Sequence, residues 1–121
     1  MTNLIPTRLA EIGYAFVMAA FGVLHFKSAN LPEVHKSLPS YFPGDPSVWI
    51  YISGAGFLLA AAAILINKYK RFACYALAAM LFVFIIVVHL EPAIKDQNYY
   101  QPLKDLGLAM AAIMIANNAS K

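Results

Sequence analysis

Four ionisable side chains lie where apolar segments of the sequence begin or end. His25 and His89 each close a long apolar run, and Lys104 and Asp105 open another. Charged groups inside hydrocarbon are costly, so ionisable residues at the margin of apolar segments are the best pointers to a function. If these segments are helices that run alternately up and down, the four side chains lie at one depth. The sequence therefore predicts a shared polar site made of His25, His89, Lys104 and Asp105.

The chemistry of such a site has several alternatives. A quinone-type ligand needs hydrogen-bond donors at the mouth of an apolar slot; His25, His89 and Lys104 could donate while Asp105 orients one of them. A metal ion could be held by the two histidines with Asp105 or Glu91, although no HxH or ExxH spacing supports it. Two histidines on facing helices could also ligate haem axially. Without a ligand, the same residues would form a structural network between helices.

The composition indicates a membrane protein. The chain has 121 residues, of which 61% are apolar and 12% charged, against about 45–50% and about 25% in soluble domains. Disordered chains lack so many apolar residues, and nine dispersed basic residues form no stripe for nucleic acid. The length allows one domain, residues 1–121. The single cysteine, Cys74, excludes an intrachain disulfide and is predicted to be an apolar packing residue.

Four apolar segments are long enough, or nearly so, to cross a bilayer as helices. They cover residues 9–26, 48–66, 72–90 and 103–117. The last is the weakest because its continuous apolar run extends only from Leu106 to Ala116. With three spans its apolar face would be uncovered, so four are predicted. The expected fold is all-α: an integral membrane four-helix bundle of up-down-up-down topology.

The connections between the segments differ in length and character. Residues 67–71 leave room only for a tight antiparallel hairpin. The outer loop between the first two helices is rich in proline, which prevents a long helix, and in apolar residues suited to the membrane interface. The basic cluster Lys68, Lys70 and Arg71, with Arg8 and Lys121 on the same side, predicts that both termini are cytoplasmic.

Other residues are predicted to hold the helices together. Glu11 is predicted to pair with Arg8, or with Lys70 or Arg71 across the bundle; the alternative is a cavity-lining carboxylate near Tyr14. Small residues allow close helix approach in lipid. Such stripes are formed by Ala15, Ala19 and Gly22 in the first segment, Gly56 and Ala60 in the second, and Gly107 and Ala111 in the fourth.

Four sequence motifs occur in the order found in a known family. They are Gly22-Val-Leu-His25-Phe26, the run from Pro39 to Pro43 followed by Trp49-Ile-Tyr51-Ile-Ser53-Gly54, the turn Lys68-Tyr-Lys70-Arg71, and Leu103-Lys104-Asp105-Leu106-Gly107-Leu108-Ala109. Between residues 11 and 116 the chain thereby resembles the DoxX family of small bacterial membrane proteins. Phe57-Leu58 stands where many relatives carry an acidic residue, and Met110 where glycine is frequent.

The resemblance implies a four-helix protein of the bacterial inner membrane that accompanies redox proteins. Relatives of this kind include a thiosulfate:quinone oxidoreductase subunit and part of a superoxide-dismutase-associated oxidoreductase complex, and others are linked to quinone or catechol stress. The expectation is a quinone-linked membrane subunit whose partners are other membrane or redox subunits, or copies of itself, and not nucleic acid. The alternative is a non-catalytic accessory or scaffold subunit of a larger membrane complex.

Overall fold

The fold is all-helical throughout the part of the chain that the structure describes. The computed structural model describes residues 5–32, 43–89 and 99–119, apart from the side chain of His89. These residues form the α-helices α1 (Thr7–Ser28), α3 (Pro46–Ile66), α4 (Lys70–Val83) and α6 (Tyr100–Asn117). A π-helical segment, η1 (Phe84–His89), continues α4. The expectation of an all-helical fold with four helices is confirmed for the described residues.

Three of the described helices are long and apolar enough to cross a membrane: α1, α3, and α4 with its extension to Val88. The helix α6 is not among them. It begins with polar residues, Tyr100-Gln101 and Lys104-Asp105, before its apolar run. The weakness expected for the fourth segment is therefore present in the structure.

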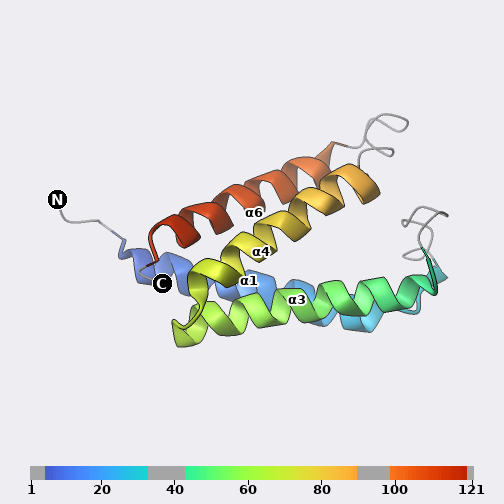
Figure 1. Ribbon diagram of the computed structural model, residues 1–121, viewed down its shortest axis with the longest axis horizontal. Coiled ribbons are helices and arrows are strands. Elements are labelled where there is room, and N and C mark those ends of the chain that lie inside the picture. The colour runs from blue at the N-terminus through green and yellow to red at the C-terminus, as the bar shows by residue number, and fades with distance from the viewer. Residues whose placement is uncertain (1–4, 33–42, 90–98, 120–121) are drawn as a thin grey trace.

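The helices associate in two pairs, as Figure 1 shows. The helix α1 packs along α3, and α4 packs along α6. The pairs approach each other where α3 turns into α4, and they diverge toward the opposite end. In Figure 1 the red end of α6 lies near the blue start of α1. The diverging end contains the last turns of α1, the first turns of α3 and α6, and η1.

Two glycines allow the close approach of α1 and α3. A Cβ atom on Gly22 would lie 2.7 Å from Leu58 Cγ and 3.0 Å from the carbonyl oxygen of Gly54. A Cβ atom on Gly54 would lie 3.0 Å from His25 Cβ and 3.1 Å from the carbonyl oxygen of Gly22. The two backbones therefore touch directly, as small residues permit in membrane helices. The predicted stripe on α1 ends at this contact, with Ala15 fully buried.

The turn between α3 and α4 reverses the chain within three residues. Asn67 and Tyr69 both adopt left-handed backbone conformations, with φ of 60° and 57°. Asparagine enters this region more easily than most residues and commonly ends helices. The amide of Lys68 donates to the carbonyl oxygen of Ala63 at 3.1 Å, which satisfies one of the last carbonyls of α3. The short connection between the two helices therefore forms a tight turn, as predicted.

The core consists of small and aliphatic side chains. Met18, Ile64, Cys74 and Leu81 are its largest fully buried members, so the prediction of Cys74 as a packing residue is confirmed. On α3, Gly56 faces α4, because a Cβ atom there would lie 3.0 Å from Met80 Sδ.

One predicted packing stripe is wrong. Gly107 is exposed, and a Cβ atom there would have nothing within 4 Å. The helix α6 instead buries Ala109, Ala112 and Ala116, which follow one another at three- and four-residue steps. Such steps keep residues on one helix face. Gly107 lies off this face, and four-residue spacing alone did not fix which face meets α4.

Some predictions concern residues outside the described part of the chain. They are the interfacial character of the proline-rich loop over residues 33–42, the role of Glu91 as a ligand, and the contribution of Lys121 to the charge bias.

Candidate ligand pocket

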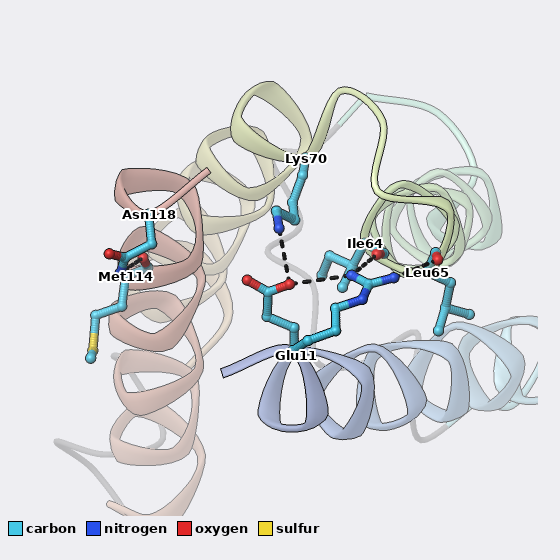
Figure 2. Close-up of polar contacts among 7 residues, drawn as sticks. Glu11, Ile64, Leu65, Lys70, Met114 and Asn118 are labelled. Carbon is cyan, nitrogen blue, oxygen red and sulfur yellow. Dashed lines mark hydrogen bonds and ion pairs between the residues drawn. The ribbon is translucent and has the colours of Figure 1, made fainter. Parts of the chain in front are cut away.

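The converging end of the helix pairs is held by an ion-pair network around Glu11, which Figure 2 shows. Glu11 is 5% exposed, and its Oε1 accepts from Lys70 Nζ at 2.9 Å and from Arg8 Nη1 at 3.2 Å. Arg8 also donates to the carbonyl oxygens of Ile64 and Leu65 at 2.6 Å and 2.7 Å. The predicted pairing of Glu11 with Arg8 and Lys70 is confirmed. The network connects α1 with the end of α3 and the start of α4.

Further hydrogen bonds connect α6 to the other helices at this end. Arg71 Nε donates to the carbonyl oxygen of Ala116 at 3.3 Å, and the Tyr75 hydroxyl donates to Asn117 Oδ1. Nearer the middle of the bundle, the Tyr14 hydroxyl of α1 donates to the carbonyl oxygen of Leu108 at 2.6 Å. These contacts connect α6 to α4 and α1. The helix pairs separate at the opposite end, where a cavity can form.

A pocket of about 410 Å³ opens between the two helix pairs where they diverge. Residues of α1, α3, α4, η1 and α6 all line it. The lining is mainly aliphatic and aromatic, with polar side chains at a few positions: His25, Ser28, Ser53, Gln101, Lys104 and Asp105. Ligand sites in proteins typically occupy about 300–1,000 Å³ and combine an apolar wall with a few polar groups. This pocket has that size and composition.

Three of the four residues predicted to form a polar site line this pocket. They are His25 from the end of α1 and the neighbours Lys104 and Asp105 from the first turns of α6. His89 is the last residue of η1, and its side chain is outside the described set. Other residues of η1, Phe84, Val87 and Val88, line the pocket. The structure therefore brings His25, Lys104 and Asp105 together.

His25 is held in place on several sides. Its Nδ1 lies 2.8 Å from the carbonyl oxygen of Phe21, one turn earlier in α1. The ring of Phe57 lies with its centroid 5.0 Å from the imidazole at a tilt of 59°. The ring of Phe84 is nearly parallel to the imidazole, at 11° and 6.2 Å between centroids. These distances are typical of interacting aromatic pairs. The hydrogen bond and the two ring contacts together stabilise this orientation of the imidazole.

The two charged residues of α6 differ in exposure. Asp105 is only 4% exposed, whereas Lys104 is exposed. Lys104 Nζ donates to Gln101 Oε1 at 2.8 Å and lies 5.0 Å from the centroid of the Phe21 ring, a cation–π distance. The pocket therefore holds a cation and a carboxylate on adjacent residues, close to the imidazole of His25.

The sequence did not single out the aromatic wall of the pocket. Phe57, Phe84 and Trp49 all line it. The spacing did hold a signal: Gly22 and His25 lie three residues apart, on one face of α1. Extending the small-residue stripe to His25 would have placed the imidazole toward α3. Within residues 5–32, 43–89 and 99–119, no three His, Cys, Asp or Glu side chains are grouped to hold a metal.

The fold and the pocket together define a small all-helical protein with membrane-length helices and a ligand-sized cavity between two helix pairs. The chain belongs to a family described as "Domain of unknown function (DUF8561)", whose model matches residues 14–118. The matched region includes α3, α4, α6 and all the described pocket residues. Comparison with curated proteins and with solved structures finds no match.

Proposed function

We propose that this protein is an integral membrane four-helix bundle that binds a quinone-type ligand in the pocket between its two helix pairs. The observation that carries the proposal is the convergence of His25, Lys104 and Asp105 on one largely apolar pocket. The helices α1, α3 and α4 with η1 would span the bilayer. The helix α6 would complete an up-down-up-down bundle, because it buries an alanine face along α4.

The basic residues support a definite orientation. Arg8, Lys68, Lys70 and Arg71 all lie at the converging end of the bundle, beside the α3–α4 turn. Positively charged residues concentrate on the cytoplasmic side of membrane proteins. The converging end and both termini would therefore face the cytoplasm of a bacterial cell, and the pocket would lie in the outer half of the inner membrane.

The pocket wall favours a ring-shaped ligand with a polar end. Four aromatic rings, those of Phe21, Trp49, Phe57 and Phe84, line the pocket and offer faces for a planar ring. Its polar groups, by contrast, are few. A quinone-type headgroup combines a flat apolar ring with oxygen atoms that need hydrogen-bond partners. An apolar tail could extend between the diverging helices toward the lipid.

The resemblance to the DoxX family supports a redox context. We propose that the protein acts as a quinone-linked membrane subunit that accompanies redox proteins. In the alternative, it would be an accessory subunit without a ligand of its own. The two proposals differ in a simple observation, because a protein that only supports a complex would not bind a quinone when purified alone.

The test uses Trp49, which is the only tryptophan of the chain and lines the pocket. Quenching of its fluorescence by a short-chain benzoquinone would be titrated on the full chain in lipid nanodiscs. We expect saturable quenching, weakened about three- to tenfold by Lys104→Met through loss of a charged donor. The matched control is Lys27→Met, an exposed lysine of α1 that does not line the pocket.

Two results would contradict the proposal. Quenching that rises linearly with quinone and does not saturate would show partition into lipid only. Equal affinity in the wild type, Lys104→Met and a Phe57→Ala variant would show that the quinone binds elsewhere. Recovery of the native protein in stoichiometric complex with another membrane protein, combined with non-saturable quenching, would favour the accessory role.

A further inference from the structure

The hydrogen bond of His25 fixes which ring nitrogen carries the proton. A backbone carbonyl oxygen can only accept, so Nδ1 must be the donor in its 2.8 Å contact with Phe21. In the neutral imidazole one nitrogen donates and the other accepts. Nε2 therefore carries a lone pair whenever the His25 ring is neutral. This is the opposite of what binding to a quinone carbonyl would require, because a carbonyl needs a donor.

The position of the ring leaves this acceptor for a ligand in the pocket. His25 lines the pocket, and because its Nδ1 is bonded to the backbone of α1, Nε2 is the ring nitrogen left for a ligand there. The rings of Phe57 and Phe84 pack against the imidazole. Within the described part of the chain, no side chain or backbone group makes a hydrogen bond to Nε2.

Three other donors of the pocket lining are also bonded to backbone carbonyl oxygens. The hydroxyls of Ser28 and Ser53 donate to the carbonyl oxygens four residues earlier, at 2.7 Å and 2.8 Å. Trp49 Nε1 donates to the carbonyl oxygen of Pro43 at 2.8 Å. These three groups, like Nδ1 of His25, satisfy backbone oxygens. The hydroxyl oxygens of the serines keep acceptor capacity.

The remaining polar groups have the same bias with two exceptions, Lys104 and Gln101. The carboxylate oxygens of Asp105 are hydrogen-bond acceptors. Lys104 Nζ and the side-chain amide NH2 of Gln101 can donate, but both residues are exposed, and Lys104 already donates to Gln101 Oε1. The buried part of the pocket therefore offers mainly acceptors. A ligand that supplies its own hydroxyl hydrogen fits such a lining better than a ligand with only carbonyl oxygens.

We propose that the pocket binds ring compounds in the hydroxyl form, a phenol or hydroquinone, with the ligand hydroxyl donating to Nε2 of His25. This rests on the proposed function, because it assumes that the pocket takes a ring-shaped ligand. It names the chemical class more narrowly: the reduced, hydroxyl-bearing ring is held more tightly than the corresponding carbonyl or ether compound. His25 then determines specificity as a hydrogen-bond acceptor.

The test compares two ligands that differ only in the hydrogen atom. A 4-alkylphenol and its O-methyl ether are titrated against the full chain in nanodiscs, with Trp49 fluorescence as the readout. We expect the phenol to bind about five- to tenfold more tightly, as one hydrogen bond predicts. Partition into lipid opposes this order, because the ether is the more apolar compound. In His25→Phe, which keeps a ring but loses the acceptor, the preference disappears.

The control for the variant is Leu24→Phe, which adds the same side chain at an exposed neighbouring position of α1 outside the pocket lining. It should keep the phenol preference. Equal affinities for phenol and ether in the wild type would overturn the inference and leave ring binding intact. A preference that persists in His25→Phe would overturn the assignment to His25. Saturable binding of neither ligand, nor of the quinone, would refute the proposed function itself.

A second measurement does not depend on how His25→Phe folds. Nitrogen NMR of the histidine-labelled protein distinguishes the two neutral tautomers, and the chain has only three histidines to assign. We expect the Nδ1-protonated tautomer for His25, with a change at Nε2 when the phenol is added and none with the ether. An Nε2-protonated ring in the free protein would overturn the inference.

Discussion

Adding a single methyl group at Gly54 should separate the helices that carry the pocket. Gly54 lies on α3 against α1, and its Cβ would meet His25 Cβ at 3.0 Å and the Gly22 carbonyl oxygen at 3.1 Å. Neither atom can move away by rotating a side chain, because both are fixed to the α1 backbone. In Gly54→Ala the two helices must therefore shift as a whole, and His25 shifts with α1.

The size of the effect follows from the contact distances. Non-bonded carbon atoms pack best at about 3.5–4.0 Å, so α1 and α3 must separate by about half an ångström at this point. Overpacking of this kind costs about 1–3 kcal/mol. Replacing a helix glycine by alanine gains about 0.5–1 kcal/mol where there is space. We expect a net loss in Gly54→Ala and a net gain in Gly13→Ala, since a Cβ on Gly13 of α1 meets nothing within 4 Å.

Cys74 provides the assay. It is the only cysteine and is fully buried, so a thiol-reactive dye should report unfolding. We expect the Tm of Gly54→Ala to lie at least about 3 °C below that of Gly13→Ala. The comparison cancels the common gain in helix propensity and isolates the cost of the contact. Phenol binding should weaken in Gly54→Ala because the displaced neighbour is His25.

A Tm of Gly54→Ala equal to or above that of Gly13→Ala would refute the close approach of α1 and α3. If stability falls but ligand affinity is unchanged, the helices do touch and the link from this contact to His25 is wrong. The two readouts thus test the packing and its connection to the pocket separately.

Three further predictions concern the rest of the bundle. Lys70→Met should destabilise the protein by about 1–3 kcal/mol in detergent unfolding, because buried Glu11 loses one of its hydrogen bonds to a charged group. The neighbouring exposed Lys68→Met should change stability by less than about 0.5 kcal/mol, and equal losses would contradict the network. Tyr14→Phe should cost about 0.5–1.5 kcal/mol through loss of its hydrogen bond to α6, and an unchanged Tm would show that the bond contributes nothing. Cys74 should react with a maleimide only under unfolding conditions; rapid labelling of the folded protein would contradict its burial.

Local sequence features predicted much of the fold because they act over short distances. Apolar runs in the sequence predicted the positions of the four helices. The short connection after Ile66 predicted the tight turn between α3 and α4. The pairing of Glu11 followed from the same logic: Arg8 is three residues away on one helix, and Lys70 begins the helix after the turn. In each case the partner's position is fixed by helix geometry and chain connectivity.

The position of the pocket depends on how the helices are rotated and packed, which no local sequence pattern determines. The sequence placed His25, Lys104 and Asp105 at one depth, yet whether they face one cavity depends on helix rotation. The aromatic rings of Phe57 and Phe84 that contact His25 come from other helices. Phe84 begins a π-helical segment that its apolar sequence did not predict. The error at Gly107 has the same origin. Residue spacing shows which residues share a helix face, but it does not show whether that face packs against another helix.

The arrangement of contacts explains why the pocket occurs where it does. Charged and polar side chains connect the helices at the converging end, where Arg8 and Lys70 both reach Glu11. At the diverging end, α1 and α3 stay together through Gly22 and Gly54, so the space opens between this pair and the other. The glycine contact lies directly against the Cβ of His25. His25, which limits how closely α1 and α3 approach at Gly54, is therefore also the proposed hydrogen-bond acceptor of the pocket. A change in the spacing of α1 and α3 must alter where a ligand hydroxyl can bind.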